Sequence, residues 1–130
     1  MIRFRQMLLI DDDHAVNFIH KIMIEKSDLC NNVLTVLTGI EALEYLIKLE
    51  DPDQAPDIIL LDVNMPEMTG WEFLEEYAKL DSKIHEKVKI YMLSSSQREE
   101  DVEMAKQNDN VLGFFNKPLN IDVLQSTFAE

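Results

Sequence analysis

The stretch IILLDVNMPEMTG, residues 58–70, decides the fold, because a run of four aliphatic residues ends there on a single carboxylate, Asp62. The run has the length of a strand buried on both faces, and Asn64, Pro66 and Gly70 then break it into a loop. A carboxylate at the end of an apolar strand is costly to bury unless its charge is used there. The stretch therefore predicts a strand of a parallel sheet whose end carries a functional acid.

Four further apolar runs repeat this pattern along the chain, at residues 7–10, 33–37, 90–93 and 111–115. Each is nearly continuous rather than alternating, as expected for strands covered on both faces of a parallel sheet. Amphipathic stretches of helical length lie between them. The chain therefore predicts a doubly wound, three-layer α/β fold of five β-α units. We expect one domain over residues 1–130, with residues 51–57 and 80–87 as linkers and no output domain.

Capping residues mark where the helices begin. Ser/Thr-x-x-Glu pairs, which satisfy two free backbone amides reciprocally, occur at Thr38–Glu41, Thr69–Glu72 and Ser96–Glu99. Asp13 is expected to cap the first helix and Asn120 the last. Helical periodicity predicts a buried stripe in the first helix at Val16, Ile19 and Met23, and one in the second at Ile40, Leu43 and Ile47.

The composition excludes several classes of partner. The 130 residues include 25 acidic and 12 basic side chains, giving a formal charge of −13. Nucleic acid and anionic membranes are not expected as partners, because phosphate binding needs a basic face. The single cysteine allows no internal disulfide and favours a reducing compartment. No apolar run approaches the roughly 18 residues of a membrane span, so we expect a cytoplasmic protein without membrane insertion.

Polar side chains gather at the ends of the predicted strands, where parallel α/β sheets bind their ligands. They are Asp11, Asp12 and Asp13 after the first strand, Asp62 on the third, Ser94 and Ser95 on the fourth, and Asn116, Lys117 and Pro118 after the fifth. Neighbouring carboxylates repel unless a cation or a proton neutralises them, and oxygen ligands in an open site suit Mg²⁺. A carboxylate beside such a metal can accept a phosphoryl group, with a lysine and a hydroxyl to stabilise the phosphoryl oxygens.

Four motifs together resemble the receiver domain of two-component response regulators, the single-domain chemotaxis type included: LLIDDD, ILLDVNMPEMTG, YMLSSS and GFFNKPL. They span essentially the whole chain and occur at the right strand ends in the right order. The resemblance implies a flavodoxin-like sheet with strand order 2-1-3-4-5. It also implies that Asp62 is the phosphoacceptor in a Mg²⁺ (or Mn²⁺) site. The other ligands would be Asp12, Asp11 through water, and the main-chain carbonyl of Asn64.

The same resemblance assigns the residues of a switch. Lys117 would contact the phosphoryl group, and the Lys117–Pro118 bond is expected to be cis. Ser94 would be the hydroxyl drawn toward the phosphoryl group, and Phe114, at a position where the family often has tyrosine, would fill the vacated space. The three histidines lack metal-ligand spacing and are expected on helix surfaces or in loops: His14, His20 and His85.

We therefore expect a stand-alone receiver that takes its phosphoryl group from a sensor histidine kinase or a histidine phosphotransfer protein. It would catalyse only its own phosphorylation and dephosphorylation, and would otherwise not be an enzyme. Partner binding would switch through the face formed by the fourth helix (97–108), the fifth strand (111–115) and the last helix. The downstream target is not readable from the sequence, and we expect a monomer or a weak homodimer.

Two other readings use the same fold. The chain could be an interaction module that binds partners without phosphorylation, although the acids and the lysine that such a module could lose are present. It could instead be a flavin carrier or a haloacid-dehalogenase-type phosphatase. A flavin carrier is disfavoured because the loop after the first strand reads DDDHA and is not rich in Ser, Thr or Gly. A phosphatase of the haloacid-dehalogenase type is disfavoured because the chain is short and shows no cap domain, although Asp11 and Asp13 have the required Asp-x-Asp spacing.

Overall fold

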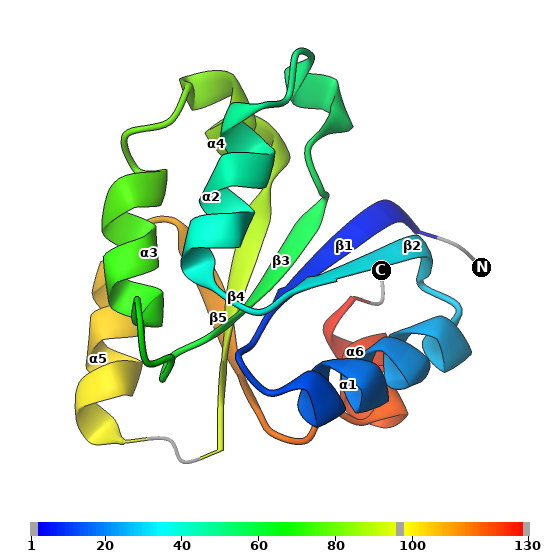
Figure 1. Cartoon of the computed structure of the whole chain (residues 1–130). Helices are drawn as coiled ribbons and strands as arrows, with labels where there is room; N and C mark the ends of the chain where they lie inside the picture. Colours follow the sequence, from blue (N-terminus) through cyan, green and yellow to red (C-terminus); the bar gives the residue numbers. More distant parts are fainter. Residues whose placement is uncertain (1–2, 96–97, 129–130) are drawn as a thin grey trace.

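The computed structural model describes residues 3–95 and 98–128, and five strands in it form a parallel sheet in the order β2-β1-β3-β4-β5 (Figure 1). The strands are β1 (Phe4–Ile10), β2 (Cys30–Val36), β3 (Ile58–Asp62), β4 (Lys89–Ser94) and β5 (Val111–Asn116). This order confirms the flavodoxin-like fold that the motifs implied. Because all five strands run the same way, their carboxyl ends meet at one edge of the sheet.

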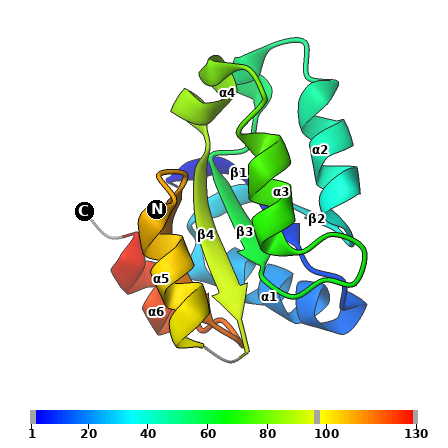
Figure 2. The same cartoon turned by 90° about the vertical axis from the view of Figure 1, so that its left-hand side faces the viewer.

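Helices cover both faces of this sheet (Figures 1 and 2). α1 (His14–Ser27) and α6 (Ile121–Thr127) lie on one face, and α2 (Gly39–Ile47) and α3 (Gly70–Tyr77) lie on the other, with α5 (Glu99–Gln107) beside α3. Successive residues of β1 enter different cores, since Leu8 packs with α2 and α3 whereas Leu9 packs with α1 and α6. The central strand β3 and the second half of β1 are therefore apolar without alternation. Among the described residues, no helix combines the length and apolar character that a membrane span requires.

The predicted capping residues fix the helix starts. Thr69 and Glu72 form the complete reciprocal box at the start of α3, and Thr38 accepts the Glu41 amide at 3.0 Å at the start of α2. Asp13 accepts the amides of Ala15 and Val16 at the start of α1, and Asn120 caps α6. Ser96 lies outside the described residues, but α5 begins at Glu99 with Arg98 as its N-cap and no side-chain capping bond, so the helix start predicted at Ser96 is wrong.

Several expectations from the sequence are wrong. In α2 the predicted stripe is only partly buried, since Leu43 is buried whereas Ile40 is 43% and Ile47 is 64% exposed. The predicted linker at 80–87 contains a short helix, α4 (Ser82–Lys87), which Asp81 caps by accepting the Lys83 amide. The buried face of α1 is also rotated from the predicted stripe: Asn17 and His20 are buried, whereas Ile19 is 45% exposed. Hydrophobic periodicity misplaced this face because polar side chains with hydrogen-bond partners occupy part of it.

Asp57 stabilises the edge of the sheet at which the strands begin. Its carboxylate accepts the backbone amide of Arg5 at 2.7 Å and pairs with the Lys87 ammonium of α4. Burial alone would raise the pKa of Asp57, but the bonds from Lys87, Arg5 and Gln6 outweigh burial and lower it. This carboxylate thus joins the start of β1 to α4, at the opposite end of the sheet from the polar strand ends.

Candidate functional site

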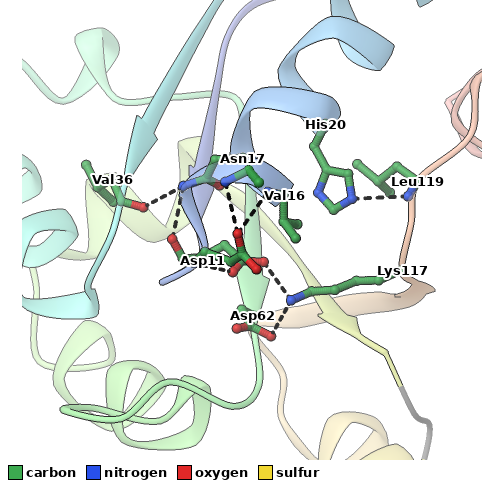
Figure 3. A network of polar contacts seen from close by, with 10 residues as sticks. Asp11, Val16, Asn17, His20, Val36, Asp62, Lys117 and Leu119 are labelled. Atoms are coloured by element: carbon green, nitrogen blue, oxygen red, sulfur yellow. Dashed lines mark hydrogen bonds and ion pairs between the residues drawn. The ribbon is translucent and has the colours of Figure 1, made fainter.

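The strand ends surround an open cleft of about 450 Å³ at the carboxyl edge of the sheet. The side chains that line it come from four different segments and include Asp11, Asp12, Asp62, Asn64, Ser95 and Lys117. The structure therefore brings together the acids and the lysine that the sequence predicted as site residues. Figure 3 shows the Lys117 side chain reaching across to the two buried carboxylates, Asp11 and Asp62.

Lys117 bridges these two carboxylates. Its Nζ lies 2.6 Å from Oδ2 of Asp11 and 3.0 Å from Oδ1 of Asp62. Burial opposes the charge of Lys117, but hydrogen bonds and attraction to both acids prevail and raise its pKa. Burial and then the charge of Asp11 raise the pKa of Asp62 to about 6, even though Lys117 acts in the opposite direction. The pocket therefore disfavours the charged form of Asp62 even with an ammonium beside it.

The charge of the pocket matches a divalent cation. Asp11, Asp12 and Asp62 can each offer one carboxylate oxygen, and these oxygens all lie within 4.8 Å of one another. Three carboxylates and one ammonium leave two negative charges uncompensated. Asp12 is exposed, so a cation bound here could keep several of its waters, as Mg²⁺ prefers. The donor set and its charge thus fit the predicted Mg²⁺ or Mn²⁺ site.

Backbone hydrogen bonds hold the loop that follows the predicted phosphoacceptor, Asp62. The Val63 amide donates to the Leu93 carbonyl at 3.1 Å, and the Gly70 amide donates to the Val63 carbonyl at 2.9 Å. A Cβ on Gly70 would lie 2.7 Å from the backbone oxygen of Asp62, so glycine permits this close return of the chain. The glycine in the opening motif therefore serves to fold the loop back against the end of β3.

The predicted switch residues lie on two neighbouring strands, Ser94 at the end of β4 and Phe114 within β5. Ser94 is buried at the end of β4, 1% exposed, and its backbone carbonyl accepts the Lys117 amide at 2.9 Å. Ser95, which was noted at this strand end but not assigned a role, lines the cleft. Phe114 is half-buried in β5 and packs against the core on the α2–α3 side. The Lys117–Pro118 bond is cis, as the resemblance implied.

Two residues of the site escaped the sequence analysis, and both lie on the buried face of α1. Asn17 donates from Nδ2 to the Asp11 carbonyl at 3.0 Å and to the Val36 carbonyl at 3.2 Å. His20, expected on a surface or in a loop, is 1% exposed and lines the cleft. A polar residue inside an apolar helical stretch was the available signal, but it does not reveal which face of the helix turns inward.

Comparison with known proteins gives one consistent result. The family model described as "Response regulator receiver domain" matches residues 7–129. The transcriptional regulatory protein CitT of Halalkalibacterium halodurans is 28% identical over 95% of this chain and 50% of its own length. The chain spans about half the length of the first curated relatives that it matches.

Solved structures resemble the chain over nearly its whole length. A two-component response regulator from Cytophaga hutchinsonii is 30% identical, with a TM-score of 0.90, over 97% of this chain and 95% of its own. The chemotaxis protein CheY4 of Vibrio cholerae is 28% identical, with a TM-score of 0.75, over 95% of this chain and 94% of its own. Fold, strand-end chemistry and sequence therefore point to the same family.

Proposed function

Because the chain belongs to the response regulator receiver family, we propose that Asp62 accepts a phosphoryl group and that the resulting aspartyl-phosphate controls the binding of a partner protein. The observation that carries this proposal is the bridge from Lys117 to both Asp11 and Asp62 inside an open cleft. An ammonium held at the acceptor carboxylate is also placed to compensate the charge of an incoming phosphoryl group.

The donor would be a phosphohistidine on a sensor histidine kinase or a histidine phosphotransfer protein. An oxygen of Asp62 attacks the phosphorus, the phosphorus–nitrogen bond breaks, and its electron pair returns to the imidazole of the donor. Lys117 then stays beside the new phosphoryl oxygens. Hydrolysis would end the signal: water attacks the same phosphorus, inorganic phosphate leaves, and the Asp62 carboxylate is restored. The chain would catalyse only these two steps on itself.

Asp11, Asp12, Asp62 and the main-chain carbonyl of Asn64 would hold Mg²⁺, or Mn²⁺ in its place. Such an ion supplies two positive charges that offset the repulsion between the acids and the phosphoryl oxygens. Support comes from the three convergent carboxylates and from the raised pKa of Asp62, about 6, which shows how strongly this pocket disfavours another negative charge. Asp11 is already tied to Lys117, which is consistent with a contact to the ion through water.

The surface that would respond is formed by α5, β5 and α6, the elements expected as the fourth helix, fifth strand and fifth helix. α5 is loosely packed: among its residues 99–107, all of them described, Ala105 is the buried one. Each element exposes an apolar side chain, namely Met104, Leu112 and Val123. Inward movement of the Ser94 hydroxyl, followed by Phe114, would shift this surface between two packings.

Acetyl phosphate with Mg²⁺ tests the proposal directly. Intact-mass measurement should show one added phosphate on the wild type and none on Asp62→Asn. Asp13→Asn is the matched control, because asparagine caps a helix as well as aspartate does, and it should be labelled like the wild type. Equal labelling of Asp62→Asn would exclude this acceptor. Partner binding that ignores beryllium fluoride, a phosphoryl mimic, would favour the phosphorylation-independent interaction module instead.

A further inference from the structure

The buried face of α1 carries two polar side chains where a helix packed on a sheet normally has apolar ones. Asn17 is 3% exposed and His20 is 1% exposed, and the two lie three residues apart on the same face. Buried polar groups are unfavourable unless they are hydrogen-bonded. Asn17 meets this requirement at Nδ2, which donates to the Asp11 carbonyl, although its Oδ1 has no partner among the described residues. His20 meets it at Nε2 only, since its Nδ1 also has no partner among the described residues.

His20 accepts a hydrogen bond at Nε2 from the backbone amide of Leu119 at 3.2 Å (Figure 3). Leu119 lies two residues after Lys117, in the turn between β5 and α6. In the same turn the Lys117 amide donates to the Ser94 carbonyl at 2.9 Å, and Pro118 has no amide hydrogen. The turn that carries the lysine is therefore fixed by β4 on one side and by His20 on the other.

We propose that His20 is a positioning residue, which holds the turn after β5 so that the Lys117 ammonium stays between Asp11 and Asp62. The inference rests on the proposed function, because positioning matters only if Lys117 assists phosphoryl transfer. Through Asn17 and His20, one face of α1 sets both partners of the 2.6 Å ion pair between Lys117 and Asp11. Neither side chain needs to touch the phosphoryl group.

The direction of this hydrogen bond fixes the state of the imidazole. Since the Leu119 amide is the donor, Nε2 must be unprotonated and the ring hydrogen must be on Nδ1. Burial lowers the pKa of His20, more than the nearby charge of Asp11 raises it, which keeps the ring neutral. Leucine could fill a similar space but offers no acceptor, whereas the side-chain oxygen of glutamine lies at a distance from the backbone similar to that of Nε2.

The test compares His20→Leu and His20→Gln with the wild type in labelling by acetyl phosphate. We expect His20→Leu to lower the maximal rate by about tenfold, because small displacements of a catalytic group are costly. The half-saturating concentrations of acetyl phosphate and Mg²⁺ should stay within about twofold, and His20→Gln should recover most of the rate. Ser27→Ala is the control, since Ser27 is buried on the same face but its hydroxyl bonds within α1.

An NMR measurement on the wild type keeps the inference testable if a variant does not fold. Histidine ¹⁵N shifts should show one ring with hydrogen on Nδ1 and a bare Nε2 coupled to the Leu119 amide. A folded His20→Leu that labels at the wild-type rate would overturn the positioning role, and so would the opposite tautomer. If the wild type is not labelled at all while the expected tautomer is seen, the proposed function fails and the His20 contact stands.

Discussion

Trp71 of α3 donates a hydrogen bond from Nε1 to Oδ1 of Asp101 in α5, at 3.2 Å. Trp71 directly follows Gly70, whose amide closes the loop after Asp62. The bond therefore joins the segment behind the candidate acceptor to the loosely packed helix of the proposed response surface. Because Trp71 is the one tryptophan in the chain, its fluorescence reports on this junction without interference.

Titration with Mg²⁺ and beryllium fluoride should therefore change the Trp71 emission. Asp101→Ala removes the acceptor, so it should shift the starting emission, reduce the response to beryllium fluoride, and lower the free energy of unfolding by about 1 kcal/mol. Glu103→Ala, a change of another exposed acid of α5, should leave both the starting emission and the response to beryllium fluoride unchanged. A wild-type spectrum that is insensitive to beryllium fluoride would contradict the proposed movement of α5.

Removing the Asp62 charge should stabilise the metal-free protein at neutral pH. The folded protein raises the pKa of Asp62 from 3.8 to about 6, so ionisation disfavours folding once the pH exceeds 3.8, and the cost is complete above about pH 6. The shift corresponds to about 3 kcal/mol as an order of magnitude. Asp62→Asn should gain stability of this order in urea unfolding with EDTA at pH 7. This gain in the free energy of unfolding should shrink toward pH 4. An Asp62→Asn variant that is less stable than the wild type at pH 7 would contradict the prediction.

Mg²⁺ should raise the free energy of unfolding of the wild type by ligand linkage, by about 2.7 kcal/mol at 100 times its dissociation constant. Asp12→Asn removes a proposed ligand, which is exposed, and should abolish most of this gain while leaving the metal-free stability nearly unchanged. The measurement is thermal unfolding over a range of Mg²⁺ concentrations, with Asp13→Asn as the neighbouring control. An undiminished gain in Asp12→Asn would remove Asp12 from the ligand set.

Asp57→Asn should destabilise the protein at pH 7 by about 2 kcal/mol, because hydrogen bonds to the charged carboxylate are lost. The pKa of Asp57 is lowered in the folded protein, so its contribution is present above the unfolded pKa of 3.8 and fades as the pH falls through the folded value. The difference between variant and wild type should therefore narrow below about pH 4. Asp53→Asn, at an exposed position nearby, should show no such dependence.

The sequence was sufficient to predict those site residues whose positions follow from the direction of the strands. Once the apolar runs are taken as parallel strands, Asp11, Asp62 and Lys117 must meet at one edge. The contribution of α1 could not be predicted in this way. Asn17 and His20 are buried because they bind backbone groups of distant segments, and Leu119 is 99 residues from His20. Periodicity favoured Ile19 instead, since it measures hydrophobicity and not hydrogen-bond partners.

The separation of Asp57 from the cleft has an evolutionary consequence. One rim of the sheet helps to maintain the fold through Arg5, Asp57 and Lys87, while the opposite rim carries the cleft with the proposed phosphoacceptor. Mutations could therefore adapt the chain to a hotter or more acidic habitat at the first rim without altering how long a signal lasts. The reverse does not hold, because changes to Asp62 or to Mg²⁺ binding at the cleft also change the free energy of unfolding.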